Sequence, residues 1–223
     1  MERQFDTQIE EIKNLILQMG GQVEKCLDEV IQGLVHRDIN KFALVHKIEE
    51  KINEDHVKVD NSCLNFLAKQ GPVARDLRLI ISVIKINSDL ERMGDQCVNI
   101  AYTGKDYMLR APVGGLQEIE KMSKVVRQMV KASLDSFVRE DVELAHKILL
   151  MDDEVDDLKK KVLHDRLQIM KTQPEASEAA LDIILIARNL ERLGDHATNI
   201  AEDVIFVSTG KDIRHGGKYS ATS

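Results

Sequence analysis

Pairs of carboxylates spaced four residues apart are the side chains of this chain best suited to chemistry. Glu91 and Asp95 form one such pair, and Glu191 and Asp195 form another, both within stretches of helical periodicity. Residues at positions i and i+4 of a helix lie on one face, about 5–6 Å apart. Facing pairs would make a box of oxygen ligands, which suits divalent ions: iron or manganese before calcium, with zinc as a further candidate. The pattern therefore predicts metal binding.

A third pair lies in the stretch that precedes Glu191. Asp152 and Asp156 fall between apolar positions of residues 142–172 on a helical wheel. Burying a carboxylate alone is costly, so such groups are neutralised, paired or bound to a cation. We therefore expect these two aspartates to converge with Glu191 and Asp195 on one metal site.

The matching stretch of the first half, residues 39–69, is poorer in acids. Glu49 and Asn53 take the corresponding inward positions, and His56 and Asp60 follow on the same arc. Because Asn53 is neutral, we expect weaker metal binding in the first half unless His56 or Asp60 contributes. The predicted metal ligands are Asp152, Asp156, Glu191, Asp195, Glu49, Glu91 and Asp95, with Asn53, His56, Asp60, Asn99 and Asn199 as supplementary donors.

The apolar residues upstream of these acids set their expected direction. Leu77, Ile81 and Ile84 share an arc about 80° wide that continues as Glu91 and Asp95. The arc predicts that the acids face the core. The alternative is that they pair with basic side chains when two bundles pack together, and the candidates are Arg75, Arg78, Arg92, Arg188 and Arg192.

The elements that position these acids are duplicated. Residues 91–95 read Glu-Arg-Met-Gly-Asp and residues 191–195 read Glu-Arg-Leu-Gly-Asp, and Asn-Ile-Ala follows four residues after each. A repeat of about 100 residues is too long for a solenoid unit, so each copy should be a small domain. Pro112, Gly114 and Gly115 separate the copies.

Each copy divides into three amphipathic stretches. The predicted helices span residues 2–36, 39–69, 73–109, 116–139, 142–172 and 175–208, with Asp38 and Asp141 as N-caps. We therefore predict an all-α fold, a tandem repeat of two elongated three-helix bundles. The first bundle would span 1–110, the second 115–209, and 210–223 would form a flexible tail.

Composition supports this fold and excludes several others. Aromatic residues make up 4% of the 223 residues and proline only three, which fits long helices and excludes an all-β fold. The three cysteines are widely spaced, which predicts small core residues instead of a disulfide framework. Both halves are acidic, so no nucleic-acid partner is expected. A charged N-terminus and the lack of any run of about 18 apolar residues predict a cytosolic protein.

Together the doubled signature, the two three-helix copies and the segment Pro72-Val73-Ala74-Arg75-Asp76-Leu77-Arg78 resemble the PhoU family of phosphate transport system accessory proteins. The resemblance covers nearly the whole chain. It implies a dimer-forming regulator that restrains phosphate uptake and phosphate-responsive transcription. It also implies as partners a phosphate ABC transporter, through its ATPase, and a membrane-bound sensor histidine kinase, and multinuclear metal sites at the paired acids. The family's middle helix usually supplies an acid where this chain has Asn53.

Two other functions compete with a regulatory adaptor. A di-iron or di-manganese carboxylate oxidase also holds metal with acids on helices, but it needs Glu-x-x-His from two helices. This chain offers only Glu143-Leu144-Ala145-His146, near the start of its stretch. The third reading is a helical scaffold in which the acids serve interhelical ion pairs.

Overall fold

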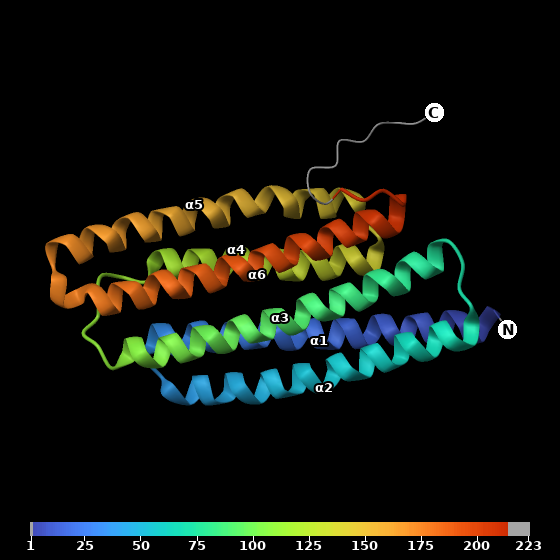
Figure 1. Ribbon diagram of the computed structural model, residues 1–223, viewed down its shortest axis with the longest axis horizontal. Coiled ribbons are helices and arrows are strands. Elements are labelled where there is room, and N and C mark those ends of the chain that lie inside the picture. The colour runs from blue at the N-terminus through green and yellow to red at the C-terminus, as the bar shows by residue number, and fades with distance from the viewer. Residues whose placement is uncertain (1, 214–223) are drawn as a thin grey trace.

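Six long helices build the part of the protein that the structure describes. The computed structural model describes residues 2–213, with side chains from Asp6 onward. The elements are α1 (Glu2–His36), α2 (Ile39–Gln70), α3 (Arg75–Met108), α4 (Gln117–Arg139), α5 (Val142–Thr172), the short 3-10 helix η1 (Pro174–Ala176) and α6 (Ser177–Thr209) (Figure 1). No strand occurs in this range, so the all-α prediction is confirmed. Most of the predicted tail, residues 214–223, lies outside the described residues.

The helices form two elongated three-helix bundles packed side by side. Helices α1, α2 and α3 pack together, as do α4, α5 and α6, and consecutive helices run antiparallel (Figure 1). The bundles meet where α3 packs along α6 and α1 packs along α4. A helix of more than 30 residues is about 50 Å long, so these contacts run along most of the molecule.

Local signals place the helix ends. Asp38 caps α2 by accepting a hydrogen bond from the backbone N–H of Asn40, and Asp141 caps α5 by accepting one from Leu144. At the other ends, Gly71 after α2 and Gly210 after α6 have positive φ angles of 54° and 73°. Glycine adopts this left-handed conformation without a steric penalty, so both positions stop a helix.

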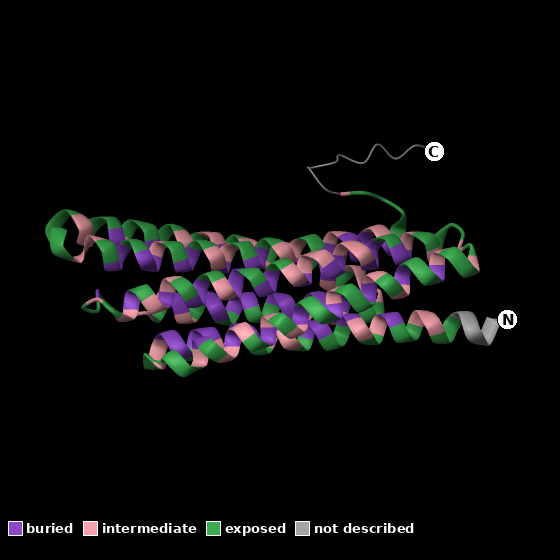
Figure 2. Cartoon of the chain, turned by 60° about the horizontal axis from the view of Figure 1, so that its bottom comes forward, coloured by how far each residue is buried: buried purple, intermediate pink, exposed green. Residues whose placement is uncertain are grey.

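The buried residues of both bundles form one continuous core. Figure 2 shows the buried residues gathered where the helices face one another. At Gly20 of α1, a Cβ atom would lie 2.2 Å from Leu134 Cδ1 of α4, so this glycine lets the two bundles approach closely. All three cysteines are buried, as predicted. Within residues 2–213 no helix combines the length and apolarity that crossing a membrane requires.

The expected direction of the acid-bearing arc is wrong. Leu77 and Ile81 were expected in the core, but they are 38% and 40% exposed. Helix α3 contacts α6 as well as its own bundle, so its buried arc is centred on residues such as Val83 and Leu90. The arc that carries the acids lies at the edge of this buried surface, and the acids therefore border solvent.

Polar contacts between α3 and α6 join the bundles near the middle of their shared seam. Asp89 of α3 accepts a hydrogen bond from the side chain of Asn199 at 3.1 Å and lies 2.8 Å from Nδ1 of His196. Further along, Lys85 forms an ion pair of 3.3 Å with the buried Asp203. These contacts fix how the two bundles sit against each other.

The linker between the bundles is also held in place. Arg166 of α5 is 5% exposed, and its guanidinium donates to the backbone carbonyls of Val113 at 3.0 Å and Gly115 at 2.6 Å. Gly114 has φ +66°, and a Cβ atom there would lie 2.5 Å from Nη1 of Arg166. The linker therefore depends on both a glycine and a buried arginine.

Candidate metal centre

Asp152 and Asp156 of α5 and Glu191 and Asp195 of α6, here called the second acid cluster, lie on adjacent helices. Lys159 connects two of them: its ammonium lies 2.9 Å from Oδ1 of Asp156 and 2.6 Å from Oε1 of Glu191. One cation therefore already bridges α5 and α6 at this point. Burial opposes the charge of Lys159, but its hydrogen bonds to Glu191 and Asp156 outweigh that effect and raise its pKa.

The other two acids of the cluster, Asp195 and Asp152, are repelled by the negative charges around them. Partial burial raises the pKa of Asp195 to about 6, and the negative charges of Glu191 and Asp152 add to the rise. Partial burial also raises the pKa of Asp152, and repulsion from Asp156 and Glu191 contributes. The structure thus brings the four acids of the second half close enough for their charges to repel one another.

The cluster is more open than a dedicated metal cage. Asp195 is exposed, and Asp152, Asp156 and Glu191 are half-buried. Among the described residues, no three His, Cys, Asp or Glu side chains converge as the ligands of one ion would. The ammonium of Lys159 lies between two of the oxygens instead. The donor chemistry nevertheless fits a hard divalent ion, because such ions prefer carboxylate oxygens and would offset this repulsion.

The first acid cluster, Glu49, Glu91 and Asp95, is the counterpart on α2 and α3. Partial burial raises the pKa of Glu91, as do the charges of Asp95 and Glu49, while His56 and Arg92 oppose the rise. Asn53, one turn after Glu49, donates a hydrogen bond from its side-chain amide to the Glu49 carboxylate. Two acids of α3 and one of α2 therefore act together, with His56 nearby.

His56 and Asp60 have partners of their own. Nε2 of His56 lies 3.4 Å from Oδ2 of Asp60. Asn87 of α3 donates to Oδ1 of Asp60 at 2.9 Å and to the backbone carbonyl of His56 at 3.0 Å. His56 therefore lies within electrostatic reach of Glu91, whereas Asp60 is held by the buried amide of Asn87.

The two supplementary asparagines lie apart from the acids. Asn199 donates to Asp89 across the seam between the bundles, so its side chain serves that seam. Asn99 is exposed. The Glu143 and His146 side chains, which a di-metal oxidase would use, are both exposed near the start of α5.

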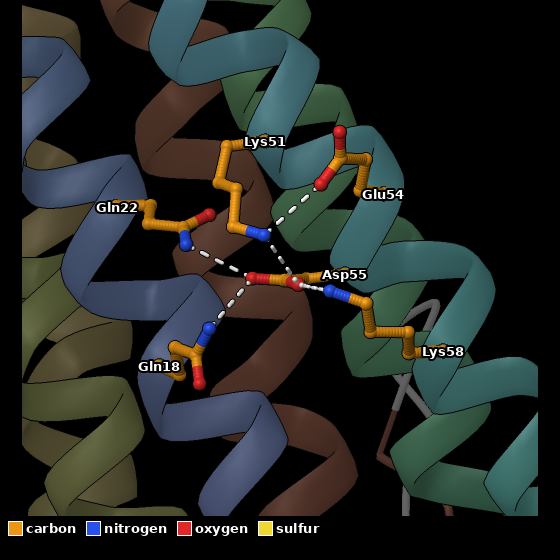
Figure 3. A network of polar contacts seen from close by, with 6 residues as sticks. All are labelled: Gln18, Gln22, Lys51, Glu54, Asp55 and Lys58. Atoms are coloured by element: carbon orange, nitrogen blue, oxygen red, sulfur yellow. Dashed lines mark hydrogen bonds and ion pairs between the residues drawn. The ribbon is translucent and has the colours of Figure 1, made fainter.

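The most deeply buried acids are residues that the sequence did not single out. Asp55 of α2 is fully buried; it accepts hydrogen bonds from Gln18 at 3.0 Å and Gln22 at 2.9 Å, both of α1 (Figure 3). Lys58 and Lys51 of its own helix approach the other carboxylate oxygen at 2.7 and 3.6 Å. Burial alone would raise the pKa of Asp55, but hydrogen bonds from Lys58 and Gln22 and the charge of Lys51 hold it below its usual value.

Two more buried acids, like Asp55, are paired with basic side chains. Asp182 of α6 binds Arg110 at 2.9 Å, and Asp203 binds Lys85.

The sequence contains one signal of the buried Asp55, because lysines lie three and four residues away from it on the same helix. The glutamines that complete its shell come from another helix, and no spacing within α2 could reveal them.

Comparisons with known proteins agree with this architecture. The family model described as PhoU domain matches twice, at residues 16–103 and 119–204. The phosphate-specific transport system accessory protein PhoU homolog of Pseudomonas aeruginosa is 37% identical over 216 residues, which cover 96% of this chain and 89% of that protein. The homolog of Pseudomonas putida is 36% identical over 96% of this chain and 84% of that protein.

Solved structures give the same answer. The crystal structure of PhoU from Pseudomonas aeruginosa superposes with a TM-score of 0.90 at 36% identity, covering 93% of this chain and all of that one. The phosphate transport system regulatory protein PhoU from Streptococcus pneumoniae superposes with a TM-score of 0.87 at 26% identity, covering 93% and 98%. Two matched domains, whole-length similarity and the shared fold establish that this chain belongs to the PhoU family.

Proposed function

We propose that the protein is a metal-binding adaptor that restrains phosphate uptake and phosphate-responsive signalling. It acts in the cytoplasm as a homodimer, between the ATPase of a phosphate ABC transporter and a sensor histidine kinase at the inner face of the membrane. The observation that carries this proposal is the match of both PhoU domains over most of the chain. The relatives are named accessory proteins of phosphate-specific transport, which supports a regulatory role.

The metal ions of this proposal are iron or manganese, with zinc as the alternative. In the second acid cluster, Asp152, Asp156, Glu191 and Asp195 would hold the ion, and in the first acid cluster Glu49, Glu91 and Asp95 would do so. A bound ion would supply positive charge where carboxylates now repel one another. The role of the protein residues is to bring these oxygens to the edge between two helices of each bundle, and such a role needs no turnover.

Recovery of partners from membranes tests the adaptor role. Tagged protein is incubated with membranes from cells grown at high and at low phosphate, and the transporter ATPase and the kinase are quantified. We expect both to be recovered, in amounts that differ between the two phosphate conditions. Recovery of neither protein under either condition would overturn the proposal.

A paired set of variants connects this assay with the metal. Asp152→Asn with Asp156→Asn removes two charges from the second acid cluster, and Asp153→Asn with Asp157→Asn removes two exposed charges of the same helix as a control. We expect only the first pair to change partner recovery. Metal-dependent consumption of dioxygen or peroxide by the parent, lost in the first pair alone, would favour the oxidase instead.

A further inference from the structure

Lys159 lies where a cation of the second acid cluster belongs, although it is not itself a metal ligand. We propose that Lys159 is the resident counter-ion of this cluster, and that a divalent ion binds only by displacing its ammonium into the neighbouring groove between α5 and α6. The inference rests on the metal binding proposed above. Lys159 would thereby set the metal affinity of the second acid cluster and connect metal binding there with the groove between α5 and α6.

The distances establish why the ammonium and a metal exclude each other. Lys159 donates to Asp156 and to Glu191 at 2.9 and 2.6 Å, so it uses one oxygen from each helix. A divalent ion held by all four acids of the cluster would take ligands from the same two carboxylates. Two cations sharing those ligands would lie within a few ångströms of each other, where their repulsion is strong. One must leave when the other binds.

The structure also provides a place for the displaced side chain. A groove of about 270 Å³ adjoins the cluster between α5 and α6, and Lys159 already forms part of its lining, together with Lys160, Leu163, Ile184 and Arg188. The aliphatic stem of lysine packs against apolar surface while its ammonium remains in water. Displacement therefore needs only a change of side-chain rotamer, and it adds a positive charge to this groove.

The first copy serves as an internal comparison. Position 56 corresponds to position 159 in the repeat, and it carries His56, which pairs with Asp60 at 3.4 Å. Asp156, the second acid that Lys159 contacts, corresponds to Asn53 in the first copy, and the amide of Asn53 donates to Glu49. The first acid cluster therefore has no lysine between its helices, and competition is a property of the second cluster alone.

Manganese titration of the chelator-treated full chain tests the competition. Lys159→Met removes the ammonium and keeps most of the stem, and Lys161→Met is the matched control, because Lys161 pairs with Glu118 of α4. We expect Lys159→Met to bind Mn²⁺ about tenfold more tightly at one site, a typical size for coupling between two ligands. Lys161→Met should bind like the parent. Circular dichroism verifies the fold, and Lys159→Gln replaces Lys159→Met if that variant unfolds.

Chemical labelling reports the displacement itself. Acetylation of each lysine in the parent protein is followed by mass spectrometry with and without Mn²⁺. We expect Lys159 to be acetylated several-fold faster when Mn²⁺ is present, and Lys161 to be acetylated at an unchanged rate. Equal Mn²⁺ affinity in the parent and Lys159→Met, or slower labelling of Lys159 with Mn²⁺, would overturn the competition while leaving the metal site intact. Absence of Mn²⁺ binding in both proteins would overturn the metal site and the competition together.

Discussion

Acidic side chains in this protein divide into two kinds according to what surrounds them. Asp55, Asp182 and Asp203 are deeply buried, and each is matched by a lysine or arginine within 3.3 Å. Asp152 and Asp195 are less buried; their partial burial raises their pKa values, and repulsion from neighbouring carboxylates adds to the rise. Burial therefore marks the structural acids, and mutual repulsion marks the candidate ligands.

Removing the buried charge of Asp55 should destabilise the protein. Asp55→Asn removes the negative charge that two lysines share, and the NH2 group of its amide must face either these lysines or the donor groups of Gln18 and Gln22 (Figure 3). Breaking a buried ion pair of this kind costs about 3 kcal/mol. Urea unfolding should show this loss, whereas Asp157→Asn at an exposed pair should change the free energy of unfolding by less than about 0.5 kcal/mol. Equal effects of the two substitutions would contradict this assignment.

The pKa of Asp195 makes the metal-free protein sensitive to pH. Its folded value of about 6 lies above the ordinary value of 3.8, so the folded state binds the proton more tightly than the unfolded state does. Its charge therefore destabilises the fold above pH 6, and this cost disappears as the pH falls from about 6 toward 4. Without metal, Asp195→Asn should be more stable than the parent at pH 7, and the difference should shrink at pH 5. Urea unfolding at both pH values measures this difference in stability. A difference of equal size at pH 7 and pH 5 would contradict a raised pKa of Asp195.

At the scale of the helices, adjacent glycines of α1 have different roles. A Cβ atom on Gly20 would collide with Leu134 of α4, but a Cβ atom on Gly21 would meet nothing within 4 Å. Gly20 therefore serves the approach of α1 to α4, whereas Gly21 only lowers the intrinsic stability of its helix.

This contrast gives a test with opposite signs at neighbouring positions. Gly20→Ala should lower the free energy of unfolding by about 1–3 kcal/mol, because Leu134 must move within a packed core. Gly21→Ala should raise it by about 0.5–1 kcal/mol. Adding Leu134→Ala should relieve part of this clash, so a double-mutant cycle should show that Gly20→Ala costs less free energy of unfolding in the Leu134→Ala background. A loss of similar size at both glycines would contradict the packing argument.

Periodicity and capping residues were sufficient to predict the helices, because each is encoded locally. Asp38 and Asp141 begin α2 and α5 as expected. The face of a helix is harder to predict, since a wheel identifies an apolar arc but not which neighbours cover it. Ile81 borders solvent because α6 covers a different arc of α3. Lys159 was missed for a related reason: its significance depends on Glu191, which belongs to another helix.

At the scale of the whole molecule, the two bundles are alike in fold but differ in charge. The second acid cluster has four acids and a lysine, whereas the first acid cluster has three acids with Asn53 and His56 beside them. The bundles should therefore respond differently to metal, although their helices are arranged in the same way.

Metal removal should reveal this difference. We expect titration of Mn²⁺ into the chelated protein to show two affinity classes and to raise the thermal unfolding temperature. Asp152→Asn with Asp156→Asn should eliminate one class and its share of the thermal shift, while helicity is retained. Calorimetry and thermal scans measure both quantities, and a single affinity class in the parent would contradict the asymmetry.

The seam between α3 and α6 has a direct bearing on assembly. Its charged contacts use Lys85 and Asp89 from α3, and the repeat places Leu185 and Asn189 at the corresponding positions of α6. Two first bundles pairing through α3 would set Lys85 opposite Thr103 instead of Asp203 and leave its charge without a partner. The two duplicated halves therefore present different, complementary residues at their shared seam. A first bundle thus recognises a second bundle better than it recognises another first bundle, which disfavours pairing between like bundles.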